Sequence, residues 1–143
     1  MAALPAVLAN SAETGLLDVV TTVAIEEERP DWRGTLTGQF TRDRWHSLAR
    51  ASYYGGFASA QPGYCDACRE EYGSKTLVDV ETGFQFDQMN ISIGIRNLFD
   101  VYPDQADPVS QMNSFGIFPW AAASPFGFNG RYLYTRAEIA LTY

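Results

Sequence analysis

Hydrophobic and polar residues alternate along most of the chain after residue 31. A period of two indicates β-strands whose two faces meet different surroundings. About five long strands are predicted in this way, over residues 34–41, 45–54, 78–86, 91–96 and 131–143. Short polar turns at 42–44 and 87–89 join the first two strands and the next two, so the sequence predicts an all-β antiparallel meander.

The N-terminal segment has a different pattern. Within 11–29, apolar residues recur at helical spacing, although the β-branched run 19–23 favours a strand. Pro30 ends this element, because a proline disfavours helical geometry in the residue before it. We therefore expect residues 1–30 to form an outer-loop remnant with a short helix, and residues 31–143 to form the strands and their loops.

Connections of two lengths alternate along the chain. The turns at 42–44 and 87–89 are tight, whereas 58–74 and 100–129 are long and rich in Gly, Pro, Ser and aromatic residues. Short turns on one rim and long loops on the other are typical of outer-membrane barrels. The predicted strands span 6–13 residues, and most of them are longer than the strands of soluble sheets and long enough to cross a bilayer when tilted.

Alternation alone fits both a soluble β-sandwich, whose apolar face points inward, and a membrane barrel, whose apolar face meets lipid. Two features favour the barrel. Aromatic residues gather near strand ends, where interfacial girdles lie. Full charges also occupy the polar face in mid-strand, at Arg50, Asp79, Glu81, Arg96, Arg136 and Glu138. A secreted soluble β-sandwich that acts as a binding module is the alternative.

Composition narrows the function classes. The formal net charge is −7 and Lys75 is the single lysine, so no basic stripe is present to neutralise nucleic-acid phosphates. No stretch approaches the roughly 20 apolar residues of a membrane helix. The opening residues 1–9 are apolar but have no basic region before them, which does not fit a signal peptide. We therefore expect a truncated product or an excised fragment of an exported protein.

Four segments together resemble the late barrel strands of TonB-dependent outer-membrane receptors. They are Asp31–Thr37, Arg50–Gly55, Ile91–Asp100 with its Asn-Leu-Phe-Asp ending, and Ser124–Arg131 before a last strand that ends in an aromatic residue. The resemblance implies the C-terminal end of a barrel like the 22-stranded outer-membrane transporters, whose lumen a separate plug closes. It also implies a bacterial outer-membrane location and import of a scarce siderophore, cobalamin or saccharide, without catalysis or a cofactor.

The same resemblance implies partners. These are the outer-membrane lipid, the remainder of the barrel and its plug, and the TonB energy complex, which would act through the plug that this chain lacks. The last strand carries Ile139, Leu141 and Tyr143 at every second position. This ending resembles the signal that the barrel-assembly machinery reads, and it is also compatible with an ordinary last strand.

Two loop features are candidate sites. Cys65 and Cys68 form a lone C-x-x-C, for which we favour a local disulfide over a metal site or reactive thiols. The aromatic residues Phe118, Trp120, Phe126 and Phe128 could stack on a sugar or siderophore. They could equally pack the loop over the barrel mouth.

No catalytic or metal site is predicted. His46 lies beside Asp43 and Ser47, but His46 and Ser47 should point to opposite faces of one strand, so they cannot form a triad. We interpret His46 as an interfacial side chain. Asp79 and Glu81 share a face, which predicts a charge ladder with Arg50 or Arg96 rather than a pair of catalytic acids.

Overall fold

A computed structural model describes residues 19–60, 69–107 and 118–141 of the chain. This part is mostly antiparallel β-structure with one short helix, which confirms the predicted fold class at this level. The elements in chain order are α2 (Val19–Glu26), β1 (Arg33–Arg42), β2 (Trp45–Tyr54), β3 (Phe57–Ala60), β4 (Arg69–Tyr72), β5 (Lys75–Phe86), β6 (Met89–Arg96) and β7 (Tyr132–Ile139). No helix in the described residues is both long and apolar enough to cross a membrane.

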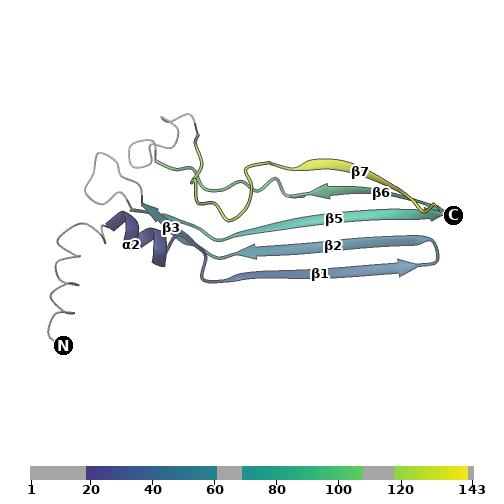
Figure 1. Ribbon diagram of the computed structural model, residues 1–143, viewed down its shortest axis with the longest axis horizontal. Helices are drawn as coiled ribbons and strands as arrows, with labels where there is room; N and C mark the ends of the chain where they lie inside the picture. The colour runs from purple at the N-terminus through teal and green to yellow at the C-terminus, as the bar shows by residue number, and fades with distance from the viewer. Residues whose placement is uncertain (1–18, 61–68, 108–117, 142–143) are drawn as a thin grey trace. The chain divides into compact units, whose positions relative to one another are not determined.

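The chain divides into two compact units, which we call the sheet unit and the loop unit. The sheet unit comprises residues 32–54, 74–102 and 127–143. Its five strands lie side by side in the order β1-β2-β5-β6-β7, and every neighbouring pair is antiparallel (Figure 1). Strands β1 and β7 are the two edges. The five strands predicted from the alternation are thus confirmed, in the predicted sequential order.

Both tight connections of the sheet are two-residue turns at the same end of the sheet unit. Asp43 and Asp87 open them, with φ values of 54° and 42°. Two-residue hairpin turns need positive φ, and aspartate tolerates this region better than most residues. The connections 55–74 and 97–131 join strand ends at the opposite end of the sheet. The predicted alternation of short and long connections is therefore present.

The register sorts the side chains of all five strands onto two faces. Across one row, Ala49 of β2 lies opposite Val80 of β5, and Val80 lies opposite Ile95 of β6. We call this side the apolar face. Its large members are Leu36, Phe40, Trp45, Val78, Val80, Phe84, Phe86, Ile91, Ile93, Ile95, Leu133 and Ile139.

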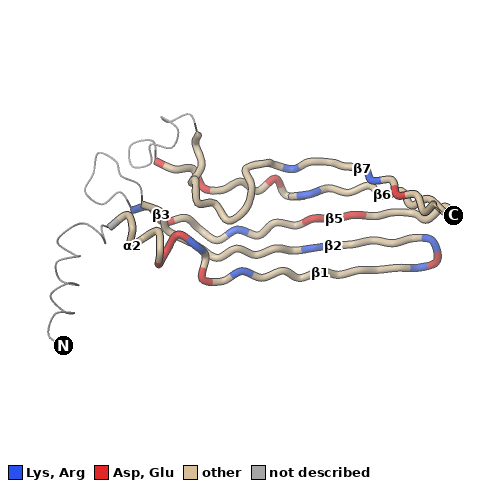
Figure 2. The backbone as a smooth tube through the Cα atoms, viewed as in Figure 1, with Lys and Arg blue, Asp and Glu red and all other residues tan. Residues whose placement is uncertain are grey.

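The opposite side is the charged face. It carries Arg50, Asp79, Glu81, Arg96, Arg136 and Glu138. Figure 2 shows several of these charges along the middle of the strands, away from the turns. A one-residue slip in any strand would move its charges to the apolar face, so the common register is strongly specified.

The loop unit comprises residues 1–31, 55–73 and 103–126, of which 19–31, 55–60, 69–73, 103–107 and 118–126 are described. Helix α2 packs through Val23 and Val20 against Ala58 and Ala60 of strand β3. Strand β3 pairs with β4 in a separate two-stranded sheet. These short strands lie within the connection predicted as loop, because four residues each give too little alternation to detect.

Candidate functional site

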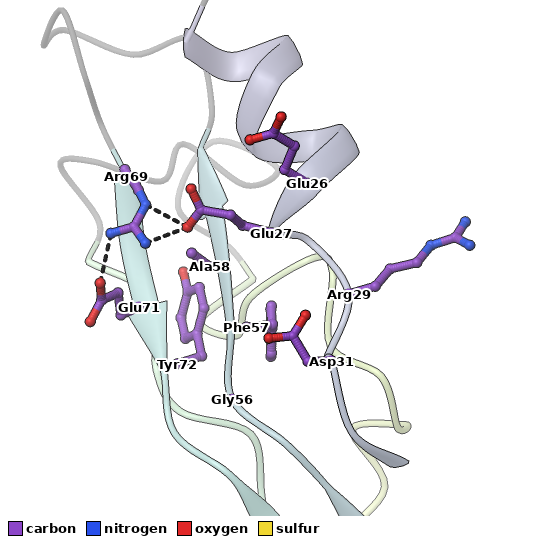
Figure 3. Close-up of a pocket in the computed structure, with 10 residues that line it drawn as sticks. All are labelled: Glu26, Glu27, Arg29, Asp31, Gly56, Phe57, Ala58, Arg69, Glu71 and Tyr72. Carbon is purple, nitrogen blue, oxygen red and sulfur yellow. Dashed lines mark hydrogen bonds and ion pairs between the residues drawn. The ribbon is translucent and has the colours of Figure 1, made fainter.

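The loop unit contains a pocket of about 260 Å³ between the end of helix α2 and the β3–β4 sheet. Figure 3 shows its lining residues, which come from the segments 26–31, 56–58 and 69–72. Four of them are acidic (Glu26, Glu27, Asp31 and Glu71) and two are basic (Arg29 and Arg69), which gives the lining a formal charge of −2. The pocket is therefore polar and acidic at its rim.

Arg69 joins the two walls of this pocket. Its Nε donates a hydrogen bond of 2.9 Å to Glu27 Oε2, its Nη2 also binds Glu27, and its Nη1 donates to Glu71 Oε1 at 2.7 Å. These hydrogen bonds, that of Glu27 first, raise the pKa of Arg69 above its ordinary value, so the guanidinium stays charged. The backbone adds a second link, since Ala58 N donates to Glu27 O at 2.9 Å.

An aromatic pair forms the apolar part of the pocket. The rings of Phe57 and Tyr72 are stacked, with centroids 4.9 Å apart and an interplanar angle of 24°. The Tyr72 hydroxyl donates to Glu70 at 2.6 Å, and Glu70 accepts a second hydrogen bond from the N–H of Asp107 at 3.0 Å. Burial first, and then the hydrogen bond to Glu70, raise the pKa of Tyr72 above its ordinary value. The Tyr72 side chain is thus held by stacking on Phe57 and by the hydrogen bond of its hydroxyl to Glu70.

The lining residues can supply ion pairs, hydrogen bonds and an aromatic surface, which is the chemistry of binding. None of them is a serine, cysteine or histidine that could act as an activated nucleophile or its base. Among the described residues, no group of three or more His, Cys, Asp or Glu side chains could hold a metal ion.

The charged face of the sheet unit carries a second polar arrangement, centred on Glu81. Its carboxylate accepts a hydrogen bond of 2.7 Å from the Tyr134 hydroxyl and another of 2.7 Å from Arg136 Nη2. The Glu81 side chain is only 10% exposed, whereas that of Arg136 is 49% exposed. Glu81 thus forms an ion pair with Arg136, whereas we predicted Arg50 or Arg96 as its partner. Arg50 lies directly opposite Asp79 in the register.

The Asn-Leu-Phe-Asp segment forms a hydrogen-bonded turn at the end of β6. Asn97, which is 4% exposed, donates from Nδ2 to Val101 O at 2.8 Å and accepts from Val101 N at 2.9 Å. Its own N–H donates to Asp79 Oδ1 at 3.0 Å. Asp100 accepts from the N–H of Arg131, just before β7, at 2.6 Å. The turn therefore ties the end of β6 to Asp79 of β5 and to the start of β7.

His46 lies on the charged face, and Ser47 lies on the apolar face, as the sequence predicts. The Nε2 of His46 is 3.1 Å from the Oγ of Ser92, which is 1% exposed. Gly83 leaves room for the imidazole, because a Cβ there would stand 2.3 Å from the ring. The His46 side chain is thus packed on the charged face against β5 and β6. Its position at the membrane interface stays a prediction.

The four predicted loop aromatics are all described, and all are partly buried. Phe118, Trp120 and Phe126 belong to the loop unit, whereas Phe128 belongs to the sheet unit. Trp120 is held by a β-bridge to Gln105. Their role in binding a ligand stays a prediction.

The other predicted site residues divide between described and undescribed parts of the chain. Ile139 and Leu141 are described and are 64% and 73% exposed. Cys65, Cys68 and Tyr143 lie outside the described residues. The disulfide and the assembly signal therefore stay predictions.

Sequence reasoning missed the loop-unit pocket and the pairing of His46 with Ser92. The pocket joins segments about 30–40 residues apart, and its key contact links Glu27 to Arg69 across that distance. The one available signal was the acidic run 26–28 in a connection that otherwise looks irregular. A comparison of the chain with protein-family models, curated proteins and solved structures found no match.

Proposed function

We propose that this chain supplies the C-terminal barrel strands of a TonB-dependent receptor, which binds a scarce nutrient and imports it across a bacterial outer membrane. The sheet unit crosses the membrane, and further strands continue the sheet at the edges of β1 and β7. The partly buried pocket of the loop unit belongs to the surface that captures the ligand. The nutrient is a siderophore, cobalamin or a saccharide.

The common register of the five strands is the observation that carries this proposal. It gives one face that is largely apolar across all five strands and an opposite face that holds the mid-strand charges. The apolar side chains are also open to the surroundings: Leu36 is 77% exposed, Leu133 is 65% exposed and Ile139 is 64% exposed. Contiguous apolar surface of this kind marks a contact with membrane or protein.

The hydroxyl groups on the apolar face are compatible with contact with hydrocarbon. Ser47 and Thr82 lie opposite each other on β2 and β5, with their oxygens 3.0 Å apart. The Thr82 hydroxyl also lies 3.2 Å from the carbonyl oxygen of His46, to which it donates. Each hydroxyl therefore has a partner within the sheet, and neither needs water, whose absence makes an unpaired polar group costly in a bilayer.

The length of the apolar face also agrees with the thickness of a membrane. Trp45 and Tyr53 lie on this face at the two ends of β2. Eight residues separate them, which corresponds to about 26 Å along a strand. At the tilt of about 40° usual in such barrels, this span covers roughly 20 Å of membrane thickness, close to the apolar band of about 25 Å between two aromatic girdles.

The soluble β-sandwich alternative would need a second layer over the apolar face. The exposures of Leu36, Leu133 and Ile139 show no such layer among the described residues. Lipid can cover the apolar face without a second protein layer, and we therefore prefer the receptor over the soluble sandwich.

Spin labels on neighbouring residues test the membrane contact. Cys65 and Cys68 are first replaced by Ser, and single cysteines are then placed at Leu36 or Thr37, and at Ile139 or Glu138. These pairs are all exposed and differ in face. In lipid vesicles, labels at 36 and 139 should relax faster with oxygen, and labels at 37 and 138 with a water-soluble nickel chelate. Equal accessibility, or the reverse pattern, would contradict the proposal.

Uptake measurements test the transport function. A bacterial strain that lacks the gene should take up less of one labelled nutrient when a ferric siderophore, cobalamin and a saccharide are each offered at limiting concentration. Expression from a plasmid should restore that uptake. Unchanged uptake of all three, together with correct spin-label accessibility, would leave a membrane protein with a different function.

A further inference from the structure

The apolar face is not evenly filled. A groove of about 480 Å³ runs over β1, β2 and β5, where the residues of this face are Gly38, Phe40, Ser47, Ala49 and Val80. Gly38 and Ala49 lie opposite each other in the register, so two of the smallest side chains meet at its centre. Its floor is apolar, because Ser47 is hydrogen-bonded to Thr82. The groove therefore has the apolar chemistry that a hydrocarbon chain needs.

Two arginines, Arg42 and Arg44, lie beyond the groove at the short-turn end of the sheet. Arg42 lies on the same face as Gly38, opposite Trp45 and four residues further along β1. Four residues correspond to about 13 Å along a strand. Arg44 follows in the turn, so the two arginines stand on either side of Asp43 in the sequence.

Both guanidinium groups keep donors for a further anion. Arg42 Nε is 3.9 Å from the Asp43 carboxylate, and Arg44 Nη2 is 3.5 Å from that of Asp87. The arginine side chains are 80% and 61% exposed, so these ion pairs are weak. A guanidinium has five N–H donors and binds phosphate oxygens in pairs.

We propose that one anionic glycerophospholipid binds this surface, with an acyl chain in the groove and its phosphate at Arg42 and Arg44. Phe40 lies at the arginine end of the groove and Trp45 lies opposite Arg42, where the glycerol ester region of the lipid falls. The proposal rests on the proposed membrane location, and in a barrel of this kind the short turns face the periplasm. The lipid is therefore one of the periplasmic leaflet.

A second hollow on the same face serves as an internal comparison. It measures about 240 Å³ and lies over β5, β6 and β7, next to Ile93, Ile95 and Leu133. On its short-turn side, the turn Asp87-Gln88 carries a carboxylate, and strands β5, β6 and β7 have no arginine on the apolar face. Lipid should pass over this hollow without a preference for charge.

Fluorescence quenching by brominated lipids tests the proposal. The full chain with Trp32→Phe and Trp120→Phe keeps Trp45 as its reporter, next to Arg42. In phosphatidylcholine vesicles we compare small, equal mole fractions of brominated phosphatidylglycerol and brominated phosphatidylcholine. An arginine near a membrane surface favours an anionic lipid by about fivefold. We expect the brominated phosphatidylglycerol to bind at least about fivefold more strongly.

Two pairs of variants locate the effect. Arg42→Gln with Arg44→Gln should remove the preference, whereas Arg33→Gln with Arg131→Gln changes the net charge equally and should keep it. Gly38→Leu should weaken lipid binding, because the leucine side chain fills the groove. The strand should tolerate this side chain, since the nearest atom to a Cβ at position 38 is 4.0 Å away. Gly34→Leu, on the same face with nothing within 4 Å, should not weaken binding.

The outcomes separate the two proposals. Quenching that is equal for both brominated lipids, or a preference that survives Arg42→Gln with Arg44→Gln, would overturn the lipid site and leave the membrane location intact. Absence of quenching by either lipid would contradict the membrane location itself. Loss of the preference in Gly34→Leu as well as Gly38→Leu would show that the groove is not the binding position.

Discussion

The backbone N–H of Asn97, one residue beyond the end of β6, donates a hydrogen bond of 3.0 Å to Oδ1 of Asp79 in β5. Asn97 has a φ of 51° and is nearly buried, so a residue without a suitable side chain would be strained and leave polar groups unpaired there. The Asn-Leu-Phe-Asp segment is thus a device that fixes where β6 stops and where the chain returns to β7.

Replacement of Asn97 by alanine should destabilise the sheet unit. Two side-chain hydrogen bonds to Val101 are lost, at about 1 kcal/mol each, and the positive φ adds roughly 1 kcal/mol of strain. Asn97→Gly, which relieves the strain, should lose about 1 kcal/mol less than Asn97→Ala. Denaturant unfolding in detergent measures both, and equal losses would show that the backbone conformation contributes nothing.

Gly94 should not tolerate a side chain, because the ring of Tyr134 lies against it. A Cβ at Gly94 would stand 2.5 Å from ring atoms of Tyr134. We expect Gly94→Ala to destabilise the sheet by about 1–3 kcal/mol. Gly34→Ala, in open space on β1, is the matched control and should be close to neutral. Similar losses at both positions would mean that strand glycines matter here only through backbone freedom.

Glu81 and Arg136 should be energetically coupled. Their 2.7 Å ion pair joins a side chain that is 10% exposed to one that is 49% exposed, so solvent screens it only in part. A double-mutant cycle with Glu81→Gln and Arg136→Gln should give a coupling of about 1 kcal/mol. The coupling should fall as salt is raised. A coupling near zero at low salt would show that the hydrogen bond from Tyr134 holds Glu81 alone.

Tyr72 should weaken the loop unit at alkaline pH. Its pKa in the folded chain is raised, so the folded state holds the phenol proton more tightly than the unfolded state does. This contribution is fully present below the ordinary tyrosine pKa of about 10 and is lost as the pH rises through the higher folded value. Comparison of wild type with Tyr72→Phe by hydrogen exchange at Ala58 measures it. Identical alkaline profiles would contradict the assigned burial.

The sheet unit could be predicted from sequence because its information is local. Alternation fixes the face of Val80 or Arg50 without knowledge of any partner, and aspartates at 43 and 87 mark turns whose neighbours must pair. A short helix was predicted within 11–29, and α2 occupies 19–26 although its β-branched run favours a strand. A side-chain pair such as Asn97 and Asp79 follows from the register only once strand ends are known to within one residue.

The loop unit could not be predicted, because its contacts depend on chain reversals without periodic signals. Arg69 gave no hint that Glu27 would be its partner. Strands of four residues around Phe57 and Tyr72 are shorter than the alternation needs to be recognised. The pairing of His46 with Ser92 could not be predicted either, because it depends on the missing side chain at Gly83.

The insertion of β3 and β4 between β2 and β5 has a consequence for how the sheet is made. The β1–β2 and β5–β6 hairpins close over two residues each and can form within microseconds. Their docking must wait until the longer connection brings the hairpins together. Loop-closure entropy grows only by about 0.6 kcal/mol for each doubling of length. That connection can therefore lengthen or change in sequence while both hairpins, and the register of β2 against β5, stay unchanged.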